Sequence, residues 1–321
     1  MSKETIIQTQ NLTKFYGKSR GIENLNLEIY NEEIFGLLGP NGAGKTTTCR
    51  LLLDLIYKTS GRAQIFNLDI HHHSTKIRQR TAYLPGELGL YQNKTARRNL
   101  KYLLGLYENH ISLRRIEELA EIFNLELDRK VKELSKGNKQ KIGIILALAP
   151  EVELLILDEP TSGLDPLITA EFYNILHDQQ KETGSTVLLS SHLLGEVERV
   201  AHRVGIIRDG SIVEVATIQQ LKNMAMKEIK VEFKTKEALQ QFSKKIPTGI
   251  VDSVILNETK TSFMISREEL SKILNLLSQS EVRDIDVTSP ALEDIFLKYY
   301  EKSSIQMKSM ENTKKKLEVE V

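Results

Sequence analysis

The clearest capacity for chemistry in this sequence lies in one glycine-rich stretch between two apolar runs. The stretch reads Gly39, Pro40, Asn41, Gly42, Ala43, Gly44, Lys45, Thr46 and Thr47. Its glycines let the backbone curl, so that successive N–H groups and the start of a helix point at one anion. Lys45 supplies a point charge for β and γ phosphates, and the Thr46 hydroxyl is a suitable Mg²⁺ ligand. The spacing G-x-x-x-x-G-K-T therefore predicts a nucleoside triphosphate site rather than an ordinary turn.

The elements that position this loop are predicted from the apolar runs around it. Residues 34–38 suit a strand, and the run that begins at Cys49 suits a helix. The apolar residues 154–157 predict a buried parallel strand, which delivers Asp158 and Glu159 at the edge where such sheets bind ligands. We expect Asp158 to bind Mg²⁺ and Glu159 to polarise the attacking water. Two surface acids that merely close a strand are the weaker alternative.

Three more side chains belong to the predicted site. His192 follows the apolar strand 186–190, and we expect it to contact the γ-phosphate, although a lone histidine is more often structural. Asp165 is predicted to cap a helix that has Pro166 at its first position. Tyr16 lies ahead of the phosphate loop, where it can stack on a nucleotide base or serve as a packing residue.

Composition limits the class of protein. The chain has 321 residues, enough for about two domains, and its 40% hydrophobic and 27% charged residues are typical of a soluble globular protein. A net charge of +1 gives no global field for nucleic acid. The single cysteine indicates a reducing compartment, and no apolar run is long enough for a membrane helix. The sequence therefore predicts a cytoplasmic protein without a transmembrane segment of its own.

Taken together, these residues resemble the nucleotide-binding domain of an ATP-binding cassette (ABC) transporter, over about residues 4 to 220. Residues 134–138 resemble the LSGGQ signature of that family, which kinases and small GTPases lack. The resemblance implies ATP and Mg²⁺ as ligands and assigns roles to matching positions. Gly39 to Thr47 match the Walker A loop, Asp158 and Glu159 the Walker B magnesium acid and general base, His192 the switch histidine, Asp165 the D-loop, Tyr16 the base-stacking aromatic, and Ser135 and Gly137 the γ-phosphate contacts of the signature.

Two positions depart from the family pattern. The signature has Lys136 in place of a glycine and Asn138 in place of glutamine. Lys136 either adds positive charge near phosphate or points to solvent. Where the Q-loop glutamine of the family would stand, this chain has Gly86 and then Glu87, so Glu87 is a candidate for the Mg²⁺ and coupling role.

The expected fold is α/β: a P-loop ABC-type ATPase core with an antiparallel β subdomain and a helical subdomain, plus a small C-terminal α+β domain. We place the ATPase domain at residues 1–217, with its helical insert at about 88–150. Residues 218–300 follow the order β-α-β-β-α-β of a split βαβ domain and end in a helix that begins near Leu292. Residues 301–321 are expected to be a mobile tail. The arrangement of residues 218–300, with its final helix, resembles the accessory domain of ATPases from ABC-2 type exporters, which include drug and antibiotic resistance pumps.

The resemblance also implies partners. In the family, the signature of one subunit completes the nucleotide site of the other, so a homodimer or heterodimer of ATPase subunits is expected, bound to a separate membrane permease at the inner face of the membrane. A repair ATPase of the SMC type would carry a very long coiled coil between Lys45 and Ser135, and the interval here is far too short. An ABC-class translation factor would carry two Walker A loops, and one is present. A non-transport ATP-binding regulator remains the alternative.

Overall fold

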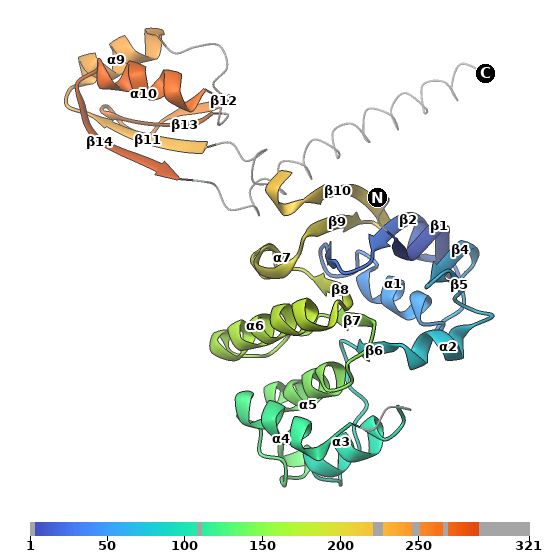
Figure 1. Cartoon of the computed structure of the whole chain (residues 1–321). Helices are drawn as coiled ribbons and strands as arrows, with labels where there is room; N and C mark the ends of the chain where they lie inside the picture. The colour runs from blue at the N-terminus through green and yellow to red at the C-terminus, as the bar shows by residue number, and fades with distance from the viewer. Residues whose placement is uncertain (1–3, 108–110, 221–226, 246–250, 266–268, 289–321) are drawn as a thin grey trace, which may run out of the picture. The chain divides into compact units, whose positions relative to one another are not determined.

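The protein, seen here in a computed structural model, is described for residues 4–107, 111–220, 227–245, 251–265 and 269–288. It divides into two compact units, Met1–Ile218 and Gln219–Val321. Figure 1 gives the element labels. Within the described ranges, no helix combines the length and the apolar character that crossing a bilayer requires.

A six-stranded sheet forms the centre of the first unit. Its strand order is β10-β9-β3-β8-β7-β6, and all neighbours are parallel except β10. The strands span Ile34–Leu38 (β3), Thr81–Leu84 (β6), Leu154–Asp158 (β7), Thr186–Ser191 (β8), Arg203–Arg208 (β9) and Ser211–Thr217 (β10). β3, β7 and β8 are buried along their whole length, as expected of parallel strands covered on both faces. Because β8 lies between β3 and β7, the loops that leave these three strands share one edge of the sheet.

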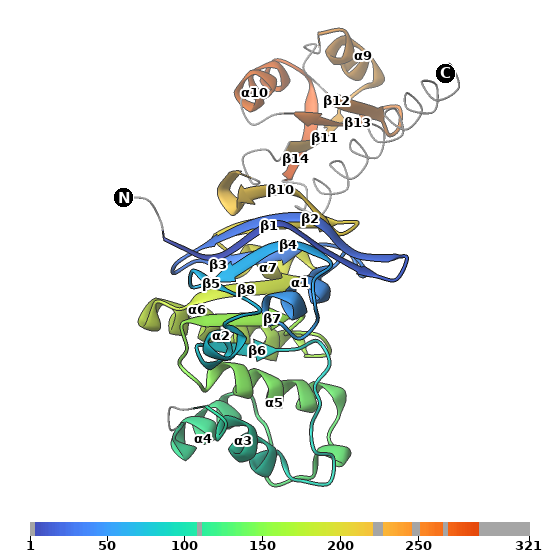
Figure 2. The same ribbon diagram turned by 90° about the vertical axis from the view of Figure 1, so that its right-hand side faces the viewer.

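A second sheet is antiparallel and has the order β2-β1-β4-β5. Its strands span Thr5–Tyr16 (β1), Ser19–Tyr30 (β2), Ser60–Ile65 (β4) and Leu68–Asp69 (β5). Helix α1 (Lys45–Leu52) lies between this sheet and the six-stranded one, as Figure 2 shows. One hydrophobic cluster joins Leu25 and Ile65 of the antiparallel sheet, Cys49 of α1, and Phe35 and Ile156 of the central sheet. Both sheets therefore hold the helix that follows the phosphate loop.

The remaining helices of this unit belong to a second hydrophobic cluster or cover the sheet. They span Ser74–Gln79 (α2), Ala96–Leu104 (α3), Leu113–Ile122 (α4), Lys136–Leu148 (α5), Pro166–Thr183 (α6) and Leu194–Val200 (α7), with a 3-10 turn at Val131–Glu133 (η1). Leu100, Phe123 and Ile145 from the helical insert pack with Leu155 of β7 and Phe172 of α6. The predicted antiparallel and helical subdomains are thus confirmed, and the helical insert joins the core of the central sheet.

The second unit has the predicted order β-α-β-β-α-β. Its elements span Lys227–Phe233 (β11), Lys236–Lys245 (α9), Val251–Ile255 (β12), Lys260–Ile265 (β13), Leu270–Ser278 (α10) and Val282–Thr288 (β14). The sheet order is β12-β13-β11-β14, with antiparallel pairing throughout, and Phe233, Phe242, Phe263 and Ile273 form its core. The helix expected near Leu292 and the tail at 301–321 lie outside the described residues.

Candidate active site

The phosphate loop begins where β3 ends. Gly42 and Gly44 have φ of +82° and +110°, conformations that side-chain-bearing residues rarely adopt. A Cβ on Gly39 would lie 2.2 Å from the carbonyl oxygen of Ile207, so this position also excludes a side chain. Gly44 is the N-cap of α1 and provides no side-chain cap, which leaves the first N–H groups of the helix to another acceptor. The loop 39–47 is therefore shaped to receive an anion at the start of α1.

Lys45 folds back over this loop. Its side chain is 5% exposed, and its Nζ donates to the carbonyl oxygens of Gly39 (2.6 Å) and Pro40 (3.1 Å). The same nitrogen lies 3.1 Å from Oε1 of Glu159, which makes no hydrogen bond of acceptable geometry. The contact is thus a charge pair without a well-directed hydrogen bond, and it joins the loop after β3 to the residue after β7.

Asp158 ends β7 in a fully buried position. Its Oδ1 accepts a hydrogen bond from the Ser190 hydroxyl at 2.7 Å, while Oδ2 is buried and has no partner among the described residues. A Cβ on Gly86, in the loop after β6, would lie 3.5 Å from that oxygen. A buried carboxylate oxygen without a donor is costly, so the position suits a cation. Asp158 together with the half-buried Thr46 offers the hard oxygen donors that Mg²⁺ prefers.

Glu159 and His192 meet across adjacent strand ends. Glu159 has φ of +51°. Its backbone N–H donates to two oxygen atoms of Ser190, the carbonyl oxygen (N···O 3.2 Å) and the hydroxyl oxygen (N···O 3.1 Å). Its Oε2 lies 2.6 Å from Nδ1 of His192, whose side chain is 43% exposed. The structure therefore brings Lys45, Asp158, Glu159 and His192 together at one edge of the sheet. A carboxylate between an ammonium and an imidazole can accept a proton and orient a water molecule.

Other predicted residues surround this centre. The Tyr16 ring ends β1, is 47% exposed and has Lys14 Nζ 5.0 Å from its centroid. A Cβ on Gly21 would approach both the Tyr16 ring (2.9 Å) and the Thr47 methyl group (3.1 Å), so this ring lies beside the phosphate loop. Glu87 is exposed and follows Gly86. Among the described residues, no hydrogen bond or ion pair joins the Glu87 carboxylate to the rest of the site.

The signature residues occupy a different place. Ser135 caps α5 by accepting a hydrogen bond from Asn138 N (3.2 Å), and a Cβ on Gly137 would lie 2.7 Å from the Gly163 carbonyl oxygen. In the described part of the chain, neither residue shares a hydrogen bond or ion pair with the Lys45 centre. Asp165 accepts hydrogen bonds from the N–H groups of Leu167 and Ile168 at the start of α6, which confirms its predicted capping role.

Several residues that support the site were not predicted. Ser190 holds Asp158 and Glu159, as described above. The Gln140 side chain donates to the carbonyl oxygen of Pro160 at 2.7 Å, and Glu196 accepts hydrogen bonds from Thr161 and Ser191. The only sequence signal for Glu196 is its spacing of one helical turn after His192, which is too common to single out a residue.

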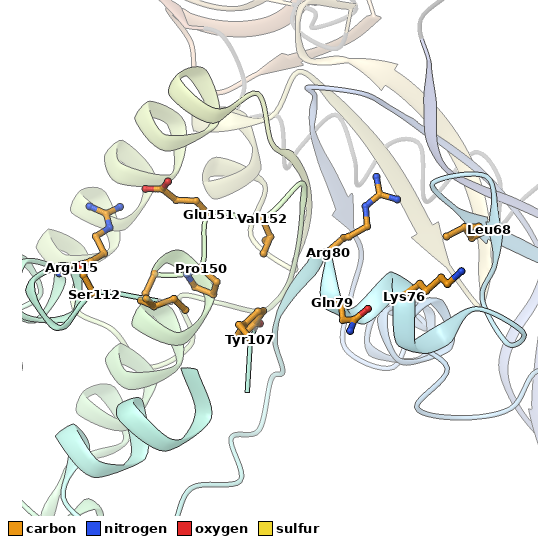
Figure 3. A pocket seen from close by; sticks show the side chains of 12 residues that line it. Leu68, Lys76, Gln79, Arg80, Tyr107, Ser112, Arg115, Pro150, Glu151 and Val152 are labelled. Atoms are coloured by element: carbon orange, nitrogen blue, oxygen red, sulfur yellow. Dashed lines mark hydrogen bonds between the residues drawn. The ribbon is translucent and has the colours of Figure 1, made fainter. Parts of the chain in front are cut away.

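A cavity of about 630 Å³ lies apart from this centre, between α2 and the helical insert. Figure 3 shows Lys76, Gln79 and Arg80 on one side and Tyr107 and Arg115 on the other. None of the predicted site residues lines it. The predicted nucleotide site lies instead around the loop 39–47 and Asp158, at the edge of the sheet.

The fold and these residues define an ATPase of the P-loop class, with a segment at the start of α5 that resembles the ABC signature. Comparison with known proteins identifies the family of P-loop ATPases to which the chain belongs. The sequence profile described as "ABC transporter" matches residues 22–162. The bacitracin transport ATP-binding protein BcrA of Bacillus licheniformis is 42% identical over 221 residues, which cover 68% of this chain and 72% of that protein. The uncharacterized ABC transporter ATP-binding protein YcbN of Bacillus subtilis (strain 168) is 34% identical over 305 residues, 94% of this chain and 98% of that protein.

Solved structures agree with the sequence comparison. An "ATP binding subunit of ABC transporter" superposes with a TM-score of 0.62 at 27% identity, over 68% of this chain and 93% of that one. The dimeric cassette MJ0796 in a post-hydrolysis state with ADP and Pi superposes with a TM-score of 0.61 at 26% identity, over 66% and 99% of the two chains. The chain therefore belongs to the ATP-binding proteins of ABC transporters, and it is an ATPase.

Proposed function

We propose that this chain powers export of a drug or antibiotic through a separate ABC-2 type permease at the inner face of the membrane. The relative named for bacitracin transport supports this substrate class, as does the "probable multidrug" protein YbhF of Escherichia coli (strain K12), 36% identical over 224 residues. These names favour a transporter subunit over a non-transport ATP-binding regulator.

The proposed catalytic centre uses the side chains that meet at the sheet edge. The loop 39–47 and Lys45 bind the phosphates, and the exposed Tyr16 ring stacks on the base. Thr46 and Asp158 would hold Mg²⁺, which neutralises phosphate charge when bound; the unpartnered Oδ2 of Asp158 supports this role. Glu87 is a weaker candidate for the same ion, because its carboxylate makes no contact with Asp158 among the described residues.

Glu159 is the proposed general base. Its position between Lys45 and His192 is the observation that carries the mechanism. When a γ-phosphate takes Lys45, the Glu159 carboxylate is released to accept a proton from the attacking water. The partly exposed His192 ring donates a hydrogen bond to a phosphate oxygen, and the contact of its Nδ1 with Oε2 orients Glu159.

The proposed active form is a head-to-tail dimer. Ser135 and Gly137 lie at the start of α5 and share no bond with the Lys45 centre of the same chain, so they are free to complete the site of a second subunit. Asp165 lies near this surface through Gly163, whose carbonyl oxygen adjoins Gly137. Closing and reopening such a dimer would move the attached permease.

The test is light scattering on the Glu159→Gln variant with ATP and Mg²⁺. Loss of a general base should slow hydrolysis by about 10² to 10⁴-fold while ATP still binds, and bound ATP should stabilise the dimer. Adding Ser135→Arg should return the protein to a monomer. Lys45→Ala, which removes phosphate binding, should stay monomeric with ATP. A monomeric Glu159→Gln protein with ATP, or undiminished turnover, would contradict the proposal.

A further inference from the structure

One carboxylate ties together the two loops that carry Glu159 and His192. Glu196, on α7, accepts a hydrogen bond from the Thr161 hydroxyl at Oε1 and one from the Ser191 hydroxyl at Oε2, each at 2.6 Å. Thr161 lies two residues after Glu159, and Ser191 lies directly before His192. Such short hydrogen bonds to an ionised acceptor are stronger than neutral ones.

The two hydroxyl groups are well enclosed. Ser191 is fully buried and Thr161 is 8% exposed. The Ser191 hydroxyl accepts a hydrogen bond from Leu193 N (3.0 Å), and of its two possible acceptors the Glu196 carboxylate at 2.6 Å is closer than the Leu193 carbonyl oxygen at 3.3 Å. Replacing Glu196 by a side chain that cannot accept both protons would deprive one of these buried hydroxyl groups of its closest acceptor, which is unfavourable.

A neighbouring phenol shows how closed this region is. Tyr173 of α6 is 2% exposed. Burial and the nearby Glu196 carboxylate raise the pKa of the Tyr173 hydroxyl well above its usual range. The loop after β7 is also held from the opposite helix, because Gln140 of α5 donates to the carbonyl oxygen of Pro160. Strand pairing therefore holds the chain up to Glu159, and side chains of α5 and α7 hold the residues that follow it.

We propose that Glu196 is a positioning residue for ATP hydrolysis, which holds the Glu159 and His192 loops at the separation that lets the two side chains meet at the γ-phosphate. This inference rests on the proposed roles of Glu159 and His192. Glu196 acts through Thr161 and Ser191 and touches neither nucleotide nor attacking water. Its loss shifts the loops and lowers turnover, while the phosphate loop still binds ATP.

The test uses variants that separate the hydrogen bond from the shape of the side chain. Glu196→Gln keeps the shape but lets only one oxygen accept. Thr161→Val removes the hydroxyl at nearly constant size, and Thr161→Ser keeps the hydroxyl. Glu214→Gln, at an exposed carboxylate on β10, is the control. Each variant is assayed for ATP turnover, for ATP affinity in EDTA and for thermal unfolding.

Misplacing a catalytic group by a fraction of an ångström is expected to lower kcat about ten- to hundredfold in Glu196→Gln and Thr161→Val, with ATP affinity changed less than about threefold. Thr161→Ser should stay within about threefold of the wild-type kcat. The double variant Glu196→Gln, Thr161→Val should be no slower than the slower single variant, because either change alone already breaks the link between the two loops. If Glu196→Gln fails to fold, the Thr161→Val and Thr161→Ser pair decides the matter by the same criteria.

Any of four results would overturn the inference: wild-type kcat in Glu196→Gln, wild-type kcat in Thr161→Val, equal loss of kcat in Thr161→Ser and Thr161→Val, or loss of ATP affinity as large as the loss of kcat. Glu159→Gln is measured beside them to separate the two proposals. Undiminished turnover in Glu159→Gln would overturn the proposed function itself. Slow turnover in Glu159→Gln with normal turnover in Glu196→Gln would overturn only the role of Glu196.

Discussion

Glu159 and an incoming phosphate compete for the same lysine. Lys45 Nζ lies 3.1 Å from the Glu159 carboxylate, and both side chains are mostly buried, at 5% and 20% exposed. ATP must take the ammonium from Glu159 and approach a carboxylate of like charge. We therefore predict that Glu159→Gln, which removes the negative charge at constant shape, binds ATP more tightly than the wild type.

The magnitude follows from the geometry. Two unit charges at this distance attract by about 5 kcal/mol at an effective dielectric constant of about 20. Desolvation of both groups offsets most of that attraction. The pair also lacks a well-directed hydrogen bond, and two of the three Lys45 protons go to the carbonyl oxygens of Gly39 and Pro40. A net competition of about 1 to 2 kcal/mol corresponds to about five- to thirtyfold tighter binding.

The assay is equilibrium titration with a fluorescent ATP analogue in EDTA, which prevents turnover during the measurement. Glu214→Gln controls for the general change in net charge. The gain in affinity should shrink only slightly between low and high salt, because the pair is largely buried and weakly screened. Equal or weaker ATP binding by Glu159→Gln would refute the reasoning, since it would mean that Lys45 is not engaged by Glu159 before nucleotide arrives.

Three further predictions concern the phosphate loop, the second unit and the ion pair between Arg80 and Glu153. Gly39→Ala places a Cβ 2.2 Å from a carbonyl oxygen of β9, so it should destabilise the fold by about 1 to 3 kcal/mol and abolish ATP binding. The control Gly195→Ala, with open space around the new Cβ, should change neither stability nor ATP binding. Equal unfolding temperatures of the two variants would contradict this prediction. A chain that ends at Thr217 should still bind ATP, because every candidate nucleotide contact precedes it; a folded fragment without ATP binding would disprove this. The hydrogen bond from Arg80 lowers the pKa of Glu153, so its stabilisation is present above the unfolded pKa and fades as pH falls through the folded one. The difference in unfolding temperature between wild type and Glu153→Gln should therefore exist at neutral pH and disappear in acid.

The elements that carry the site could be predicted because their signals are local. The glycine spacing of the phosphate loop, the apolar run before Asp158 and the Asp165-Pro166 helix start each follow from a few neighbouring residues. The alternation of residues 229–233 likewise gave a strand with one buried face, which is β11 in the structure.

The contacts between these elements could not be predicted, because they depend on register across the sheet. That Ser190 faces Asp158 follows from β7 and β8 pairing, in which these two residues are partners 32 positions apart in the chain. The 3.1 Å approach of Lys45 to Glu159 requires both the loop after β3 and the left-handed backbone at Glu159. Glu196 carries no distinctive local signal, because an acidic residue four positions after a histidine is ordinary in any sequence.

The place of β8 in the sheet has a consequence for how the protein is made. Within the described residues, β3 pairs only with β8 and β9, which are translated about 150 residues later, and the phosphate loop hangs from the end of β3. Until the ribosome has delivered β8, β3 has no neighbouring strand in the central sheet, and Asp158 has no Ser190. A nascent chain that stalls before residue 186 would therefore expose an apolar β3, and we expect it to depend on chaperones during that interval.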